Sequence, residues 1–457
     1  MRIHLLVLAA IMVSVHEPAF PDEVLRRKIA QMVVVGFNGT TLDDSVRVDL
    51  SNRNLGGVIL LGRNCVSPAQ IQQLNTQVRN FAQTPPLIAV DQEGGVVARL
   101  NQNNGFAATE RAYTLGTIWN SIDSTGVQAA RMASWLSTSG FTTNFAPVVD
   151  VNVNPASPGI GQYGRSFSRL PLTVTNHARR FVDEFHAQHV MTTLKHFPGH
   201  GSATSDSHFS LPDITHTWAD SELIPYRELI GTSDVDIVMT GHLYNGTIDT
   251  VFPTSLSYKA VTRLLRDSLH YNGVVITDDL YNMAAITDRY GFGTAARLAV
   301  NAGTDILLYV WNFRNGGSLC KAVIDTVEAM VLGGAIPLAR IDQSYDRIMQ
   351  LKGRYLPTLV EDERIVASSR PRAFSLSNYP NPFNPSTTIL YTLPTGGHSV
   401  LNVYNTLGQL VVTLVDDHQT AGQHTVVLDG SGLASGVYFC RLTAGSFIAT
   451  RKVMLVR

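Results

Sequence analysis

Residues 273–280 have the sequence Gly-Val-Val-Ile-Thr-Asp-Asp-Leu. The apolar run Val274–Thr277 is rich in β-branched residues, which is typical of a parallel strand that is covered on both faces. Two carboxylates, Asp278 and Asp279, follow this run directly. The stretch therefore predicts a buried strand that carries acidic side chains at its C-terminal end.

The same pattern, a short apolar run followed by polar residues, occurs along most of the chain. Eight such runs lie within residues 32–309, and longer helix-like segments separate them. Strands that alternate with helices predict a TIM-type (β/α)8 barrel, which we place at residues 21–356. An open doubly wound sheet is the alternative, and eight repeats disfavour it. The strand candidates are Met32–Val35, Gly57–Leu61, Leu87–Val90, Thr143–Val149, Met191–Leu194, Val235–Met239, Val274–Thr277 and Asp305–Tyr309. The helix candidates include Pro68–Phe81, Ser124–Gly140, Thr173–Gln188, Ser257–Leu269 and Thr294–Ala302.

Polar and ionisable residues follow six of the eight strand candidates. The C-terminal ends of the strands form the face on which barrel enzymes place their chemistry. We therefore expect these residues to meet in one site. They are Gly62-Arg63-Asn64, Asp91-Gln92-Glu93, Asp150, Lys195-His196, Gly241-His242 and Asp278-Asp279.

The densest group of ionisable residues lies between residues 195 and 208. It begins Lys-His-Phe-Pro-Gly-His-Gly, and Asp206 and His208 follow closely. The glycines and the proline predict a shaped loop, in which Lys195 and His196 can donate hydrogen bonds to a ligand. Asp206 can orient the imidazole of His208 and raise its basicity. A single histidine is more often structural, but the whole group at a barrel mouth favours catalysis.

Other candidates come from three separate segments. Asp278 can act as a nucleophile, whereas Asp279 can cap the following helix. Asp91 can accept a pair of hydrogen bonds from ligand hydroxyls, and Arg99 lies shortly after it, although an Asp–Gly turn alone is a weak signal. Arg165 is ambiguous by itself, since a surface salt bridge would explain it equally well.

Composition limits the class of partner. A formal net charge of −1 over 457 residues gives no reason to expect nucleic acid or an anionic membrane surface. Cys65, Cys320 and Cys440 are isolated and suggest neither a zinc site nor a disulfide framework. We expect no metal and no organic cofactor.

Both ends of the chain differ from the barrel pattern. Residues 1–20 contain the apolar run Leu5–Val13 and predict a signal peptide, with a buried first strand or helix as the alternative. No other segment has the roughly 20 apolar residues of a transmembrane helix. Residues 357–372 predict a linker. In residues 373–457, short alternating stretches predict a small antiparallel β-sandwich.

Four of the motifs together resemble the catalytic barrel of glycoside hydrolase family 3, and most closely its β-N-acetylglucosaminidase branch. The resemblance covers roughly residues 23–355. It implies that Asp278 is the nucleophile and that Asp206 and His208 form the acid/base dyad, with His208 transferring the proton. The motifs are Leu87–Arg99, Gly164–Phe167, Lys195–His208 and Val274–Met283. The residues that match sugar-binding positions are Asp91, Arg99, Arg165, Lys195 and His196.

Two details refine this resemblance. The loop has Ser202 where the family pattern usually carries Asp, from which we expect altered loop order more than lost chemistry. The β-glucosidase branch usually takes its acid/base from a second α/β domain, and no such domain follows the barrel here. The loop dyad is then the only candidate acid, which favours a hexosaminidase.

The tail resembles a second family, the sorting domains that the type IX secretion system recognises. The resemblance rests on Tyr379–Thr388, Tyr404–Gln409 and Leu433–Tyr438. It implies that the secretion machinery is a partner and that the protein is secreted or attached to the cell surface. An accessory carbohydrate-binding sandwich is the alternative.

Together these features predict a retaining exo-β-N-acetylhexosaminidase that acts through a covalent glycosyl-enzyme. Its expected substrate is a terminal β-linked N-acetylglucosamine on a glycan or a peptidoglycan fragment. A β-N-acetylglucosaminide phosphorylase and a β-glucosidase on the same barrel are alternatives. A non-catalytic surface sugar-binding protein is the alternative from another functional class.

Overall fold

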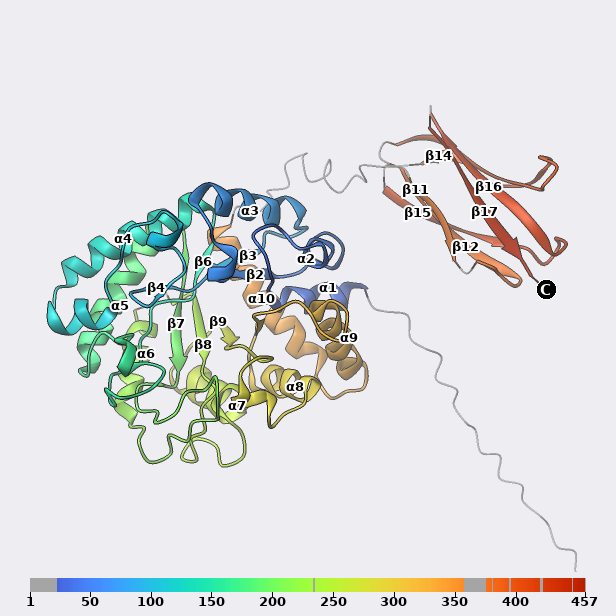
Figure 1. Cartoon of the computed structure of the whole chain (residues 1–457). Coiled ribbons are helices and arrows are strands. Elements are labelled where there is room, and N and C mark those ends of the chain that lie inside the picture. Colours follow the sequence, from blue (N-terminus) through green and yellow to red (C-terminus); the bar gives the residue numbers. More distant parts are fainter. Residues whose placement is uncertain are drawn as a thin grey trace, which may run out of the picture. The chain divides into compact units, whose positions relative to one another are not determined.

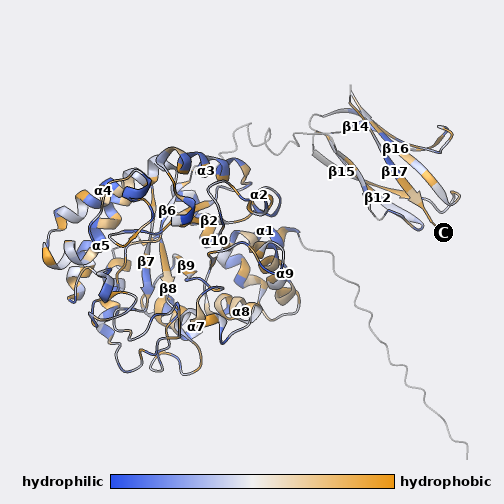
Figure 2. Ribbon diagram, in the orientation of Figure 1, coloured by the Kyte–Doolittle hydropathy of each residue, from blue (hydrophilic) through white to orange (hydrophobic). Residues whose placement is uncertain are grey.

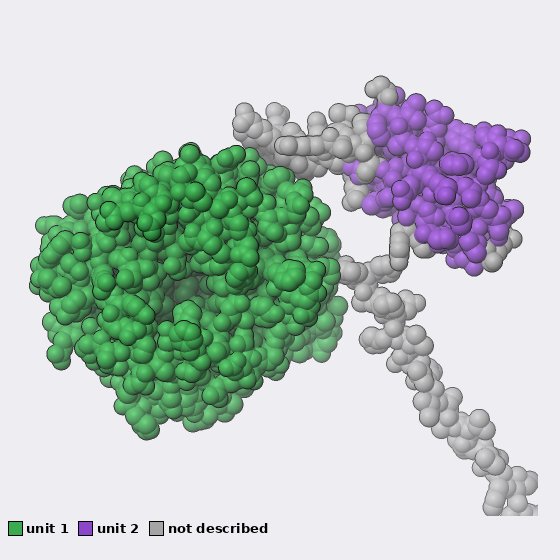
Figure 3. All heavy atoms as spheres, viewed as in Figure 1, with its two compact units in different colours: residues 1–358 green, residues 359–457 purple. Residues whose placement is uncertain are grey.

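The computed structural model describes residues 23–232, 235–356, 375–379, 381–393, 396–419, 422–445 and 447–456. The chain forms two compact units, residues 1–358 and 359–457 (Figure 3). The predicted signal peptide, residues 1–20, and the predicted linker, residues 357–372, lie outside the described residues.

The first unit contains eight parallel strands in the order β10-β1-β2-β3-β6-β7-β8-β9. Figure 1 shows the labelled strands of this sheet, such as β2, β7 and β8, inside a ring of helices. A parallel bridge between Ile276 and Ile306 joins the two ends of this sheet. The N–H of Leu280 also donates to the carbonyl of Leu308 at 3.0 Å, so the sheet closes into a barrel. The predicted (β/α)8 architecture is therefore confirmed. The strands are β1 (Val33–Gly36), β2 (Gly57–Leu60), β3 (Leu87–Val90), β6 (Thr143–Asn144), β7 (Met191–Phe197), β8 (Ile237–Thr240), β9 (Val274–Thr277) and β10 (Leu307–Tyr309).

Helices surround this barrel, with apolar faces turned toward the strands. In α3, Ser67 accepts a hydrogen bond from the N–H of Gln70 and Pro68 occupies the first turn, two features that start a helix. Figure 2 shows apolar residues along β8 and β9 and mixed colours on the outer helices. The helices are α1 (Glu23–Gln31), α2 (Asp44–Val48), α3 (Pro68–Phe81), α4 (Ile122–Ser139), α5 (Pro171–His186), α6 (Ile224–Ile230), η8 (Lys259–Ser268), α7 (Ala284–Thr287), α8 (Phe292–Ala302), α9 (Leu319–Leu332) and α10 (Leu338–Tyr355). Shorter helical turns are η1 (Asp49–Arg53), η2 (Gly62–Asn64), η3 (Gln102–Asn104), η4 (Thr114–Ile118), η5 (Gly161–Tyr163), η6 (Asp220–Leu223) and η7 (Thr254–Leu256).

Two strands differ from their predicted lengths in ways that matter for the site. The fourth was predicted as Thr143–Val149, but β6 ends at Asn144, and Val148 contributes only an isolated bridge to Lys195. Pro147 has no N–H for a ladder hydrogen bond, which explains the early end. β7 continues to Phe197, so Lys195 and His196 lie on the strand itself and not in the loop after it. A short hairpin, β4 (Gln92–Gly94) and β5 (Val97–Ala98), follows β3.

The second unit consists of two antiparallel sheets, which confirms the predicted C-terminal β domain. One sheet has the order β11-β12-β15 and the other β14-β13-β16-β17. Alternate residues on β13, such as Leu401 and Val403, are buried in a hydrophobic core that the second unit forms by itself. The strands are β11 (Ser375–Tyr379), β12 (Ser386–Leu393), β13 (Gly397–Tyr404), β14 (Leu410–Gln419), β15 (Gly422–Asp429), β16 (Gly436–Ala444) and β17 (Phe447–Leu455).

Within the described part of the chain, no helix is both long enough and apolar enough to span a bilayer.

Candidate active site

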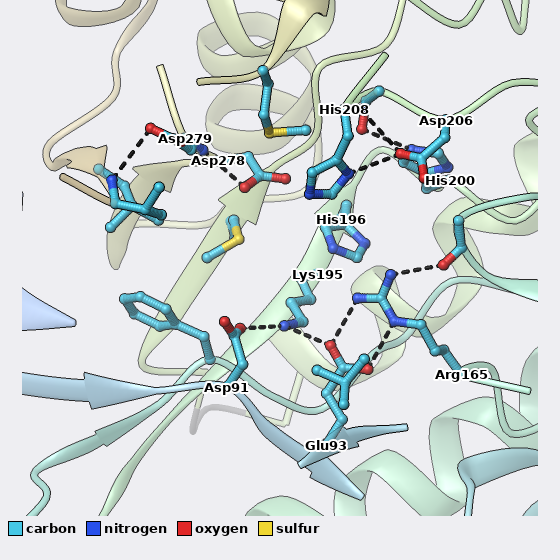
Figure 4. A pocket seen from close by; sticks show the side chains of 18 of the residues that line it. Asp91, Glu93, Arg165, Lys195, His196, His200, Asp206, His208, Asp278 and Asp279 are labelled. Carbon is cyan, nitrogen blue, oxygen red and sulfur yellow. Dashed lines mark hydrogen bonds and ion pairs between the residues drawn. The ribbon is translucent and has the colours of Figure 1, made fainter. Parts of the chain in front are cut away.

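All predicted catalytic and sugar-binding residues line one pocket of about 490 Å³. The pocket lies at the C-terminal ends of the barrel strands, and Figure 4 shows side chains from β4, β7 and the segment after β9 converging on it. The structure thus brings together Asp91, Arg99, Arg165, Lys195, His196, Asp206, His208 and Asp278. Glu93 and His200, to which the sequence assigned no role, line the same pocket.

A network of ion pairs forms one wall of this pocket (Figure 4). Lys195 Nζ lies 2.9 Å from Asp91 Oδ1 and 2.7 Å from Glu93 Oε1. Arg165 binds Glu93 with two parallel hydrogen bonds, Nε to Oε2 at 2.9 Å and Nη2 to Oε1 at 2.7 Å. Arg99 reaches Asp91 only at 3.5 Å. Arg165 is therefore part of a buried ion pair and not of a surface salt bridge.

The cations of this wall keep its carboxyl groups ionised. Burial by itself would raise the pKa of both Asp91 and Glu93. The charges of Lys195 and Arg99 outweigh burial at Asp91, and those of Arg165 and Lys195 outweigh it at Glu93, so both pKa values lie below their usual range. An ionised Asp91 can accept hydrogen bonds from ligand hydroxyls.

Asp150, two residues after the isolated bridge of Val148, fixes the orientation of His196. Its carboxylate is fully buried and accepts from His196 Nδ1 at 2.7 Å and from the His196 N–H at 3.0 Å. The N–H of His200 donates to the same carboxylate at 2.8 Å. A carboxylate beside Nδ1 favours a proton on that nitrogen, which leaves His196 Nε2 for the pocket. The sequence placed Asp150 at a strand end but assigned it no partner.

Asp278 follows β9 and faces the pocket. The N–H of Asp279 donates to Asp278 Oδ1 at 2.8 Å. Burial would raise the pKa of Asp278, but the neighbouring His242, His196 and His208 outweigh burial and lower it. The carboxylate therefore stays ionised at neutral pH, which is the form that a nucleophile needs.

Asp279 has a different environment from Asp278. It accepts from the N–H groups of Tyr281 at 3.2 Å and Val310 at 3.3 Å, and from Asn282 Nδ2 at 2.8 Å. Burial raises its pKa to about 6. Its hydrogen bonds hold the turn between β9 and α7. Asp279 does not cap the following helix as the sequence suggested, because the N-cap position of α7 is Met283.

Asp206 and His208 form a hydrogen-bonded pair at the rim of the pocket. His208 Nδ1 lies 2.8 Å from Asp206 Oδ1, and the His208 N–H donates to the same oxygen at 3.0 Å. The His208 side chain is 64% exposed and that of Asp206 is 21% exposed. Burial would raise the pKa of Asp206, but the hydrogen bonds and charge of His208 lower it. The carboxylate can thus orient the imidazole.

The segment 198–219, called the dyad loop below, is anchored on both sides. Trp218 Nε1 donates to the carbonyl of Pro198 at 3.1 Å, and Trp218 packs on a small cluster of Ala203, Ile214 and Leu243. On the other side, the N–H of Ala284 donates to the carbonyl of His208 at 3.3 Å. The second contact ties the dyad to α7, which follows Asp278.

A buried carboxyl lies beneath the dyad loop. Glu222 is fully buried and faces Ser202 and the backbone of Gly201, and burial raises its pKa to about 8. Gly199 has φ +129°, and a Cβ there would lie 2.8 Å from Glu222 Cβ, so the loop backbone passes close over this residue. In the sequence, Glu222 looks like the exposed acidic residues that commonly occur in the first turn of a helix, so its burial could not be predicted.

The chain is similar to several known proteins. Beta-hexosaminidase A of Pseudoalteromonas piscicida is 36% identical over 298 residues, which cover 60% of this chain and 49% of that protein. This chain thus spans about half the length of that relative. Beta-hexosaminidase LpqI of Mycobacterium tuberculosis is 35% identical over 353 residues, or 74% of this chain and 86% of that protein. A solved structure of a glycoside hydrolase family 3 beta-N-acetylglucosaminidase from Paenibacillus sp. str. FPU-7 superposes with a TM-score of 0.68 and 35% identity, covering 78% of this chain and 69% of that one.

Family models match both units. The model of the secretion system C-terminal sorting domain matches residues 377–456. The model of the glycosyl hydrolase family 3 N terminal domain matches residues 24–351, well over half of the chain. Both resemblances predicted from the sequence motifs are confirmed, and the chain belongs to glycosyl hydrolase family 3.

Proposed function

We infer that the chain is a β-N-acetylhexosaminidase, and we propose that it releases terminal β-linked N-acetylglucosamine with retention of configuration. Relatives named beta-hexosaminidase and a family 3 beta-N-acetylglucosaminidase structure support the substrate class. One observation supports the mechanism above all others. A single pocket holds a buried, ionised Asp278 and, at its rim, a histidine that is hydrogen-bonded to a carboxylate.

The proposed reaction has two steps. In the first, Asp278 attacks the anomeric carbon while His208 protonates the glycosidic oxygen and the leaving group departs. His208 uses Nε2 for this proton, because its Nδ1 is bonded to Asp206. In the second step, neutral His208 takes a proton from water, and that water attacks the anomeric carbon and frees Asp278. Asp91, Lys195, His196, Arg99 and Arg165 hold the sugar hydroxyls.

Replacing His208 by Ala tests this assignment. A proton donor matters most when the leaving group is a poor anion, so the variant should lose about 10²–10⁴-fold on a disaccharide and much less on an aryl glycoside of an acidic phenol. Azide needs no general base, so it should speed the variant and yield a β-glycosyl azide. His216→Ala, an exposed histidine of the same loop, is the matched control. Equal loss on both substrates without azide rescue would make His208 a binding residue.

The substrate class has its own test. The 2-acetamido aryl glycoside should be turned over with a much higher kcat/KM than the matching glucoside, because the unpaired polar partners of a missing amide cost about 1–3 kcal/mol per group. Equal rates would contradict the hexosaminidase assignment. Turnover that requires phosphate would identify a phosphorylase instead.

We propose that residues 1–20 direct export and that residues 373–457 are recognised by a type IX secretion machinery, which secretes the protein or attaches it to the cell surface. The sorting-domain match supports the second part. Truncation after Leu356 should leave purified barrel activity on aryl substrates unchanged, yet stop export in a host that has this machinery. Loss of activity from a folded truncated barrel would show that the tail contributes to the site.

A further inference from the structure

The two proposed catalytic groups differ strongly in exposure. Asp278 lies inside the pocket, whereas the His208 side chain is 64% exposed at its rim. The sugar that is attacked must therefore lie inside the barrel mouth, and the leaving group, which receives the proton of His208, must lie at the rim. This step rests on the proposed function.

Two exposed aromatic residues line the pocket or adjoin a residue that lines it. Phe209 follows His208 directly, its ring centroid lies 6.5 Å from that of His208, and it is 80% exposed. Tyr163 lines the pocket and is 45% exposed. A scattered exposed apolar residue needs no explanation, but Phe209 lies beside the proposed proton donor and Tyr163 lines the pocket itself.

The segments that carry the two aromatic residues pack against each other. The N–H of Asn154 donates to the carbonyl of Gly201 at 2.9 Å, and Asn154 Nδ2 donates to the carbonyl of Ala203 at 3.1 Å. Arg165, two residues after Tyr163, is held by its ion pair with Glu93. Tyr163 and Phe209 are therefore on adjoining, anchored segments and not on independent loops.

We propose that Phe209 and Tyr163 form a leaving-group subsite that binds the next sugar ring of the substrate. A pyranose ring presents C–H groups on its faces, and the electron-rich face of an aromatic ring attracts such groups. Asp206 and His208, next to Phe209, are paired with each other, so the contact that Phe209 offers is stacking on its ring face.

The test compares a substrate that has a leaving-group ring with one that has none. Phe209→Ala and Tyr163→Ala should each lower kcat/KM on a β-1,4-linked N-acetylglucosamine disaccharide by about 2- to 12-fold, the factor expected for one aromatic contact. Both should leave kcat/KM unchanged on N-acetylglucosaminyl fluoride, which has no second ring. Phe209→Tyr should retain wild-type selectivity. Val127→Ala, a 72% exposed residue of α4, is the control for loss of an exposed apolar side chain.

A binding measurement distinguishes an error in the proposed subsite from an error in the proposed function. In an Asp278→Ala background, the disaccharide should bind more tightly than N-acetylglucosamine, and Phe209→Ala should remove that gain. If Phe209→Ala slows fluoride and disaccharide equally, or slows the disaccharide without weakening its binding, the ring only supports the catalytic groups and the subsite is refuted. If disaccharide kinetics and binding are both unchanged, the leaving group does not touch these rings. If the wild type hydrolyses neither substrate, the proposed function fails, and the binding measurement alone decides on the subsite.

Discussion

We expect Glu222→Gln to remove a pH dependence from the stability of the barrel. Burial, reinforced by the nearby charge of Asp150, raises the pKa of Glu222 to about 8 from the ordinary value of 4.5. As pH rises from about 4.5 to about 8, the unfolded chain releases this proton while the folded chain keeps it. The free energy of unfolding therefore falls by about 1.4 kcal/mol per pH unit in this window and levels off above it, a total of about 5 kcal/mol.

The comparison needs two pH values and a signal from the barrel alone. Gln matches the size and neutrality of a protonated Glu, so the variant should equal the wild type within about 0.5 kcal/mol at pH 5 and exceed it by up to about 4 kcal/mol at pH 8. All four tryptophans lie in the first unit, so urea titration followed by tryptophan fluorescence reports on the barrel. Glu228→Gln, exposed on α6, is the control. Parallel pH profiles of wild type and Glu222→Gln would mean that Glu222 is ionised in the folded state, and the reasoning would be wrong.

Two other buried ionisable residues give further predictions. Lys352 is buried with only Gln31 Oε1 and the carbonyl of Gly56 as partners, and burial lowers its pKa to about 7. Between about pH 7 and pH 10 the unfolded chain keeps a proton on Lys352 that the folded chain has lost. The free energy of unfolding of the wild type, measured by urea titration, should therefore rise by about 1.4 kcal/mol per pH unit relative to that of Lys352→Met. A difference that stays constant with pH would contradict this prediction. Asp150→Asn weakens the charge-assisted hydrogen bonds to His196 and His200. The value of kcat/KM on an aryl glycoside should therefore fall about 10- to 100-fold. An unchanged kcat/KM would show that Asp150 does not position His196.

The barrel could be predicted from the sequence because its signal is local. Runs such as Leu87–Val90 and Val274–Thr277 are apolar at every position, and the structure forms strands over those same residues. Helix α3 was predicted at its observed bounds, since Ser67 and Pro68 mark its start. The predicted end of a strand was wrong where a single residue interrupts the hydrogen-bond ladder, as Pro147 does after β6.

The gathering of the site residues was also predictable, but their pairing was not. Asp91, Lys195, His196 and Asp278 lie at the end of a parallel strand or directly follow one, whereas the other site residues lie in the longer segments between strands. Parallel strands present their C-terminal ends on one face of a barrel. The sequence around each residue, however, does not indicate its ion-pair partners. Glu93 pairs with both Arg165 and Lys195. Asp91 pairs with Lys195 and, at a longer distance, with Arg99. These choices depend on side chains from strands far apart in the sequence.

Glu222 shows how tertiary contacts, which the local sequence does not reveal, set the pKa of a carboxyl group. A carboxyl at a helix start is normally a surface group that stabilises the first turn, and its sequence context gives no other indication. It is buried because the dyad loop folds over it, with Gly199 allowing close approach and Ser202 facing it without a second negative charge. An Asp at position 202 would bring another carboxyl to this buried place, and one of the two would have to stay protonated. The position of an ionisable residue at the barrel mouth thus follows from the strand that precedes it, whereas its pKa follows from tertiary packing.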